Sequence, residues 1–216
     1  MKIAIIGGTG AEGFGLGYRW AVAGNEIVIG SRLADKGAKA ADRMREIAPG
    51  TVVSGTDNKT AAASGEIVVL AVPYEAQELT LQAIKEELVG KLLLSVVAPI
   101  KPPKVSHVWL PDIGSAAQEA QEICGESVRV VAAFQTIAAK HLVNSLEPIN
   151  SDALICGDKK ADKEIVARLA EQAGMRGIDA GPLRNAVVAE GLVAVLIGIN
   201  IRHKVKDAGF KITGLD

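Results

Sequence analysis

Residues 1–13, Met-Lys-Ile-Ala-Ile-Ile-Gly-Gly-Thr-Gly-Ala-Glu-Gly, decide the fold. Residues 2–7 form an apolar run that predicts a buried strand, and Gly8, Gly10 and Gly13 follow in the pattern Gly-x-Gly-x-x-Gly. The first glycine permits a tight turn, the second lets the backbone approach a diphosphate, and the third lets helix and strand pack closely. The amides of the helix that follows favour an anion. The stretch predicts a dinucleotide-binding unit, and the alternative is a glycine-rich turn without a dinucleotide.

Strand and helix signals alternate along the rest of the chain, which is typical of α/β proteins. We expect a Rossmann-type, doubly wound, mostly parallel sheet with a small C-terminal α/β extension. A boundary near residue 148 would divide a dinucleotide-binding domain (1–148) from a smaller unit (149–216). The predicted strands are 2–7, 26–31, 51–55, 67–72, 92–97, 128–132, 152–156 and 175–179, with an edge strand at 210–213. The predicted helices are 9–23, 34–48, 57–63, 74–88, 115–123, 159–173 and 183–203.

Composition narrows the function classes. Hydrophobic residues make up 49% of the chain and aromatic residues 3%, so the core is built from small aliphatic side chains, as in strands buried on both faces. The formal net charge of −1 argues against a nucleic-acid binder. The chain begins directly with a predicted strand, which argues against a secretory signal. The uncharged run 191–201 is too short to span a bilayer. We therefore expect neither a nucleic-acid nor a membrane partner.

The two cysteines and three histidines suggest no metal site. Cys124 and Cys156 lie far apart, and the histidines make no metal-ligand spacing with them. Two buried thiols fit a reducing compartment, so we predict a cytoplasmic protein without a bound metal.

The end of the second predicted strand, Ile29-Gly30-Ser31-Arg32, distinguishes between the two nicotinamide dinucleotides. An NAD site needs a carboxylate here for the ribose hydroxyls, and this chain has Ser31 followed by a guanidinium. Ser31 can donate to a 2′-phosphate, Arg32 can pair with it bidentately, and Lys36 lies one helical turn further on. The pattern favours NADP. The alternative is a solvated helix surface on which Asp35 pairs with Arg32.

Glu12 is the one residue of the glycine turn that conflicts with this interpretation. Its charge suits a helix N-terminus but opposes a bound diphosphate, so we expect its side chain to point to solvent.

Three segments follow predicted strands at the edge where ligands of doubly wound sheets bind. They are Val72-Pro73-Tyr74, Ala98-Pro99-Ile100 and Phe134 to Ile137. The irregular stretch 98–114 is long for a compact domain, which favours a functional loop. No Ser or Tyr is paired with a Lys to protonate an alcohol, so we assign no catalytic side chain. A flavin-like acceptor, which needs no carbonyl protonation, fits this absence.

The sequence resembles the NADPH-dependent reductases of coenzyme F420, an 8-hydroxy-5-deazaflavin, over essentially the whole chain. The likeness rests on the glycine turn, 29–32 with Lys36, 71–74, 132–135, 156–158, 177–185, Glu190 and 211–215. It implies hydride exchange between NADP(H) and the deazaflavin in one cleft. It also implies an NADP site lined by Thr9, Gly10, Ala11, Glu12, Ser31, Arg32, Lys36, Val72, Ala98 and Ala139, with the deazaflavin near Pro73, Gln135 and the helix beginning around Arg184. The chain departs from archaeal members, which have histidine in place of Gln135 and hydroxyl residues in place of Gly191 and Val193.

The predicted helix over 186–201 is apolar around most of its circumference. Such a helix is buried in a core or against a second subunit, and we favour the interface of a homodimer. Two other functions stay open at this point. One is an NADP-dependent reductase of another small acceptor (imine, flavin or metal), and the other is a non-catalytic NADP sensor.

Overall fold

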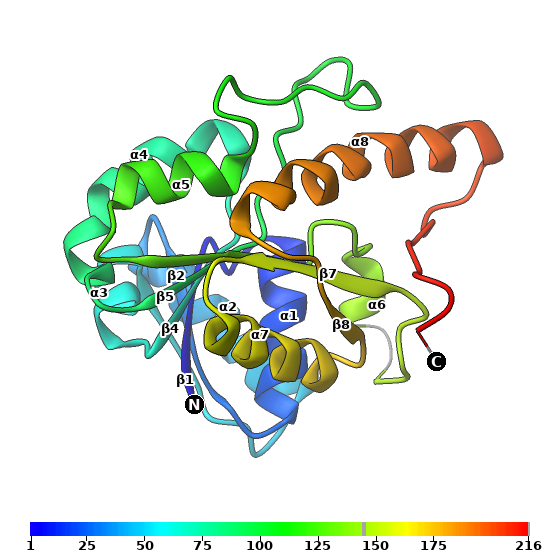
Figure 1. The fold of residues 1–216 in the computed structure, drawn as a ribbon. Coiled ribbons are helices and arrows are strands. Elements are labelled where there is room, and N and C mark those ends of the chain that lie inside the picture. Colours follow the sequence, from blue (N-terminus) through cyan, green and yellow to red (C-terminus); the bar gives the residue numbers. More distant parts are fainter. Residues whose placement is uncertain (144–145, 216) are drawn as a thin grey trace.

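The computed structural model, which describes residues 1–143 and 146–215, contains one eight-stranded sheet in the order β3-β2-β1-β4-β5-β6-β7-β8 (Figure 1). Neighbouring strands from β3 to β6 pair in parallel, β7 pairs antiparallel to β6, and β8 is parallel to β7. The first six strands have the order of the doubly wound dinucleotide-binding fold, so the predicted fold class is confirmed. The strands are β1 (Lys2–Ile6), β2 (Glu26–Ser31), β3 (Val53–Asp57), β4 (Ile67–Leu70), β5 (Leu92–Ser95), β6 (Arg129–Ala132), β7 (Asp152–Gly157) and β8 (Arg176–Asp179).

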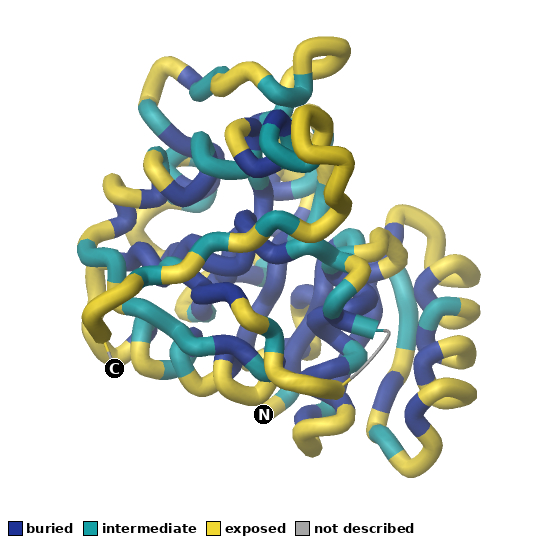
Figure 2. Tube along the Cα trace, turned by 90° about the vertical axis from the view of Figure 1, so that its right-hand side faces the viewer, coloured by how far each residue is buried: buried dark blue, intermediate teal, exposed yellow. Residues whose placement is uncertain are grey.

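Helices cover both faces of the sheet (Figures 1 and 2). One face packs against α1, α2 and α7, and the other packs against α3, α4, α5 and the first residue of α8. Alternate residues of β1 serve the two faces: Ile3 and Ile5 belong to the first core, and Ala4 and Ile6 to the second. The helices are α1 (Ala11–Val22), α2 (Ala34–Ile47), α3 (Asn58–Ser64), α4 (Tyr74–Ile84), α5 (Ala116–Cys124), α6 (Lys140–Val143), α7 (Lys160–Gln172) and α8 (Ala186–His203), with 3₁₀ turns η1 (Lys85–Leu88) and η2 (Leu183–Asn185).

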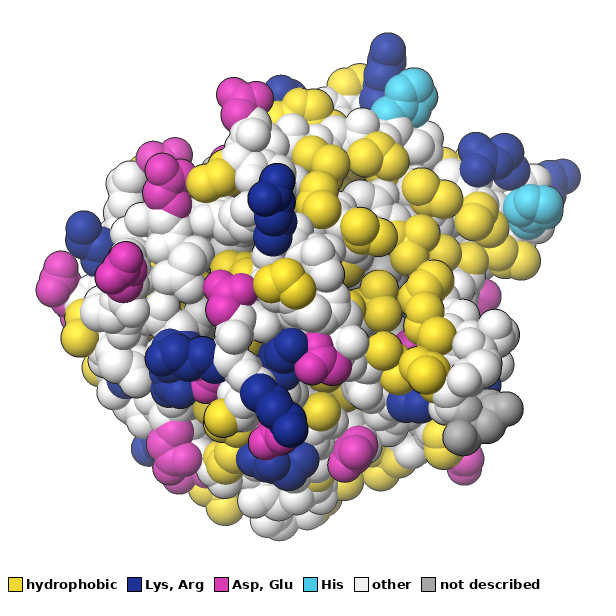
Figure 3. Space-filling view, in the orientation of Figure 1, with side chains coloured by type: hydrophobic (Ala, Val, Ile, Leu, Met, Phe, Trp, Pro, Cys, Tyr) yellow, Lys and Arg dark blue, Asp and Glu magenta, His cyan; other side chains and the backbone are white. Residues whose placement is uncertain are grey.

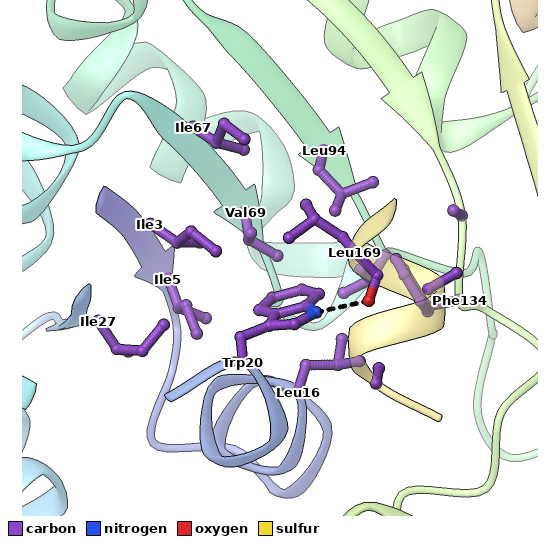
Figure 4. Packing of buried hydrophobic residues seen from close by; sticks show 14 of the residues in the cluster. Ile3, Ile5, Leu16, Trp20, Ile27, Ile67, Val69, Leu94, Phe134 and Leu169 are labelled. Atoms are coloured by element: carbon purple, nitrogen blue, oxygen red, sulfur yellow. Dashed lines mark hydrogen bonds between the residues drawn. The ribbon is translucent and has the colours of Figure 1, made fainter. Parts of the chain in front are cut away.

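Trp20 is the largest fully buried side chain and joins the two halves of the chain (Figure 4). Its indole N–H donates to the carbonyl of Leu169 on α7 over 2.8 Å, and its ring meets the Phe134 ring edge-on at a centroid distance of 5.8 Å. A buried indole needs such an acceptor. The first helix of the dinucleotide unit is therefore fixed directly to the C-terminal part of the chain.

Arg19 makes a second connection between these parts. This arginine of α1 is 3% exposed and donates to the backbone carbonyls of His141, Leu142, Glu147 and Ala173 over 2.7–3.1 Å. These carbonyls compensate the desolvation of the guanidinium. The sheet and this network both continue across residue 148, where the division into two units stays a prediction.

The structure corrects the predicted edge strand at 210–213, because these residues form no strand. The carbonyl of Phe210 accepts from the Asp152 amide over 2.7 Å, and the Ile212 amide donates to the Asp152 carboxylate over 2.6 Å. One backbone bond and one bond to a side chain do not make a ladder, so the segment lies beside the start of β7 without becoming part of the sheet. The short helix α6 was not predicted. Most predicted element ends lie within two residues of the observed ones, whereas the predicted helices 74–88 and 183–203 each include a 3₁₀ turn, η1 and η2.

Both cysteines are thiols in the structure. Cys156 is buried and Cys124 is half-buried, and burial raises the pKa of each thiol to about 11. Neither is therefore a nucleophile near neutral pH.

The segment Leu183–His203 is long and apolar enough, by length and composition, to cross a membrane, and it is the one such helix in the described part of the chain. A core helix of a soluble protein passes the same test. Here the carboxylate of Glu190, in the first half of α8, accepts hydrogen bonds from α5. These bonds tie the helix to the rest of the protein.

Candidate functional site

The glycine turn between β1 and α1 has the geometry of a diphosphate cradle. Gly7 has a φ of +77°, and a Cβ there would lie 2.6 Å from the Ala71 carbonyl oxygen. A Cβ on Gly8 would lie 2.9 Å from the Ile5 carbonyl oxygen, so neither position accepts a side chain. By contrast, the one atom within 4 Å of a Cβ on Gly10 would be a carbonyl oxygen at 3.5 Å. Gly10 thus leaves room for a ligand to approach the N-terminus of α1.

A cavity of about 580 Å³ opens beside this turn. It lies beyond the carboxyl ends of β1, β2 and β4, where ligands of doubly wound sheets bind. The cavity brings together seven residues that the sequence indicated: Thr9, Gly10, Ser31, Arg32, Lys36, Val72 and Pro73.

The remaining predicted contacts lie outside the lining of this cavity. Gly8 is buried beneath the turn, and Ala11 is exposed at the first position of α1. Ala98 follows β5, whereas Gln135 and Ala139 follow β6. The last three belong to neighbouring strand ends, so a ligand would have to extend along the sheet edge to reach them.

The cations at the end of β2 form no ion pair with any residue that the structure describes, and Glu75 is the one acidic residue in the lining of the cavity. Both cations, Arg32 and Lys36, are exposed and line the cavity. The alternative pairing of Arg32 with Asp35 is therefore not formed. Ser31 is 5% exposed at the same strand end. Two cations beside a buried hydroxyl suit a phosphate monoester.

Glu12 does not point to solvent, contrary to the expectation from the sequence. The residue is half-buried, its Oε1 is buried without a hydrogen-bond partner, and burial raises the pKa of this carboxyl to about 8. A carboxylate here would lack compensation for its lost hydration, so the neutral acid is favoured at pH 7. This resolves part of the conflict with a bound diphosphate, because a neutral Glu12 does not repel it.

The backbone is strained directly after β6, in the segment Phe134 to Ile137 that the sequence placed at the ligand-binding edge of the sheet. Phe134 has a φ of +76°, which is rare for an aromatic residue, and its ring is buried against Trp20. The next side chain, Gln135, is 6% exposed and donates through Nε2 to the Ser95 carbonyl over 3.0 Å. The ends of β5 and β6 are thereby tied together on this side of the site.

A buried carboxylate of helix α8 binds the start of helix α5. Glu190 is 2% exposed, and its two oxygens accept from the amides of Ala116 and Ala117 over 2.6 and 3.0 Å. It thus caps the N-terminus of α5 from a different helix. Burial raises the pKa of Glu190 to about 7, although the two amide bonds act in the opposite direction. The contact sets the position of α8 relative to α5.

Five lining residues of the cavity were not found from the sequence, namely Leu33, Asn58, Glu75, Ala76 and Thr80. Leu33 is 58% exposed and lines the cavity next to Arg32, which suits the face of an adenine ring. Asn58, at the start of α3, accepts from the Gly7 amide over 3.4 Å. Asn58 is 51 residues away from that turn, and no local pattern connects them. For Leu33 the available signal was its position directly after Arg32 in the sequence.

Among the described residues, no three or more His, Cys, Asp or Glu side chains gather in a way that could hold a metal ion.

Comparisons with known proteins identify the family. The sequence model of a family described as NADP oxidoreductase, coenzyme F420-dependent, matches residues 2–99. The F420-dependent NADP reductase of Methanothermobacter thermautotrophicus is 43% identical over 223 residues, covering 100% of this chain and 96% of the relative. The enzyme of the same name from Methanocaldococcus jannaschii is 39% identical, with 100% of both chains covered. A crystal structure from Arthrobacter sp. FB24, described as a candidate enzyme of this kind, superposes with a TM-score of 0.81 at 26% identity over 99% of both chains. The chain belongs to the F420-dependent NADP reductase family.

Proposed function

We propose that this protein transfers a hydride between NADP(H) and coenzyme F420. The single observation that carries the NADP half is the cavity beside the glycine turn, in which Ser31 lies with Arg32 and Lys36, two cations that make no ion pair with a described residue. The F420 half is supported by relatives that are 39–43% identical over the full chain and are named F420-dependent NADP reductases.

In this proposal the amides at the start of α1 bind the diphosphate, and the cations after β2 bind the 2′-phosphate of NADP. Val72, Pro73, Ala98, Gln135 and Ala139 form the walls further along the strand ends, and the C-terminal unit 149–216 completes the cleft for the deazaflavin. The coenzymes supply the hydride chemistry themselves. The task of the protein is to hold the two rings in contact and to exclude water, and we assign no side chain as acid or base.

The test is direct. Oxidised F420 is mixed with the protein and NADPH, and loss of the absorbance of the oxidised deazaflavin is followed. We expect rapid bleaching with NADPH and much slower bleaching with NADH at the same concentration. Binding of NADPH without bleaching would exclude an F420 reductase. If no imine, flavin or metal acceptor were reduced either, a non-catalytic NADP sensor would be favoured.

We also propose that the protein is a homodimer that forms through α8. Val188, Val195 and Ile201 are 66%, 39% and 63% exposed along this helix. Figure 3 shows a continuous hydrophobic patch on the side of the molecule where α8 lies. Patches of this kind mark interaction sites. A cytoplasmic location is part of the same proposal, since both cysteines are thiols.

Analytical ultracentrifugation at micromolar concentration tests the dimer. The wild type should sediment as a dimer and Val188→Asp as a monomer, because a carboxylate cannot be buried there without a partner. Glu46→Asp on the exposed surface of α2 serves as the control. A monomeric wild type would refute the proposal.

A further inference from the structure

The loop between β5 and α5 rises above α4, α5 and the first half of α8 (Figure 1), beside the place where we propose that the deazaflavin binds. The Trp109 ring packs on the Tyr74 ring at a centroid distance of 5.4 Å, next to Pro73. On the other side, Val108 and Leu110 are the closest neighbours of a Cβ built at Gly191 of α8, at 3.5 and 3.9 Å. The loop therefore contacts both walls of the cleft, α4 through Tyr74 and α8 through Gly191.

The charged side chains in residues 98–111 of this loop are basic. Residues 98–111 include Lys101, Lys104 and His107 and contain no Asp or Glu. All three side chains belong to exposed residues. Lys101 lies with its Nζ 4.5 Å from the centre of the Trp109 ring, and neither lysine makes an ion pair with a residue that the structure describes. Their charges are thus available to an anion from outside the chain.

The carboxylates around the loop lie outside its basic run. Asp112 and Glu119 act on the Tyr74 hydroxyl, whose pKa they raise together with burial, the larger cause. Asp112 lies in the last part of the loop and Glu119 lies in α5, so both follow residues 98–111 in the sequence. Within residues 98–111 the charged side chains are basic alone.

We propose that Lys101, Lys104 and His107 bind the polyglutamate tail of F420, with the two lysines as the main charges. The inference rests on the proposed function. A ring held between Pro73 and the start of α8 has this loop at its exit, and a chain of carboxylates leaving the cleft meets basic groups there. Trp109 holds Lys101 in place through a cation–π contact, so this charge is oriented before the tail arrives.

The experiment uses the full chain and two forms of the coenzyme, one with several glutamates and one with none. The variant is Lys101→Gln with Lys104→Gln. The control, Lys159→Gln with Lys160→Gln at the start of α7, removes the same net charge from a different helix. KM and kcat are measured for both coenzymes and for NADPH, at about 20 mM and about 0.5 M salt, which span weak and strong screening.

For the wild type we expect the long-tailed coenzyme to have the lower KM at low salt, and this advantage to disappear at high salt. The loop variant should raise that KM by about five- to tenfold at low salt, since exposed ion pairs contribute modestly. Its kcat, its KM for NADPH and its KM for the coenzyme without glutamates should stay within about twofold, and the control should behave as the wild type.

Three results overturn the proposal: no tail dependence in the wild type, an equal effect of the variant on both coenzymes, or an equal effect of the control. If neither form of F420 is reduced by the wild type, the proposed function itself fails. That outcome is distinct from a failure of the tail site, in which both forms are reduced equally well.

Discussion

Glu12→Gln should change the dependence of stability on pH, because the structure buries one oxygen of this carboxyl without a hydrogen-bond partner. Burial raises its pKa from 4.5 to about 8. Below about pH 4.5 the folded and unfolded states both carry the proton, and the burial has no electrostatic cost. Between about pH 4.5 and pH 8 the unfolded chain releases the proton while the folded chain retains it, so stability falls as pH rises. Above about pH 8 both states are ionised and the full cost is present.

The size of the effect follows from this shift. A difference of about 3.5 pH units at about 1.4 kcal/mol per unit corresponds to at most about 5 kcal/mol. Glutamine resembles the neutral acid, so wild type and variant should be nearly equal in stability at pH 4. The variant should be the more stable by up to about 5 kcal/mol at pH 9.

Urea denaturation between pH 4 and pH 9, followed by Trp fluorescence, measures this difference. Glu46→Gln removes the same charge from the exposed surface of α2 and controls for net charge. A difference between wild type and Glu12→Gln that is constant from pH 4 to pH 9 would falsify the buried placement of the carboxylate. Titration with NADP gives a second readout. Affinity should fall above about pH 8 in the wild type, where ionised Glu12 opposes the diphosphate, and should fall less in the variant.

Three further predictions concern the same site. Arg32→Ala should lower the preference for NADPH over NADH in kcat/KM by about 10- to 150-fold, the equivalent of one charged hydrogen-bonding group. Lys39→Ala is the control. An unchanged preference in Arg32→Ala would exclude Arg32 from the phosphate site. Gly37→Ala should destabilise the protein by about 1–3 kcal/mol and weaken NADP binding, because a Cβ there lies 2.4 Å from the Thr56 carbonyl oxygen and pushes α2 away from β3. Gly191→Ala, with ordinary contacts at 3.5 Å and beyond, should be tolerated in the same denaturation assay. Glu190→Gln should raise KM for F420 more than KM for NADPH. The glutamine has one acceptor oxygen in place of two, so one of the two backbone N–H groups of α5 loses its partner and α8 shifts. Equal changes of both KM values in steady-state kinetics would contradict that role.

The fold of the dinucleotide-binding half of this protein could be predicted from its sequence alone. The strand, the glycine turn and the first helix are consecutive, so their relation is local, and Ser31 with Arg32 occupies a strand end whose place beside that turn follows from the fold. The order of the first six strands follows from the same rule. Both cores could be anticipated in kind, because alternating Ile and Val residues on strands covered by helices must face inward on both sides.

The contacts between distant segments could not be predicted from the sequence and were seen only in the folded protein. Glu190 caps α5 from 73 and 74 residues away, Asn58 accepts from the amide of Gly7, and Arg19 binds carbonyls as far away as Ala173. The same holds for the residues predicted as an edge strand, which bond to Ser151 and Asp152 instead of joining a ladder. The burial of Glu12 belongs to this class as well, since exposure at a helix N-terminus depends on what packs over it. Periodicity records which face of an element is apolar, whereas these contacts depend on where chain segments meet in space.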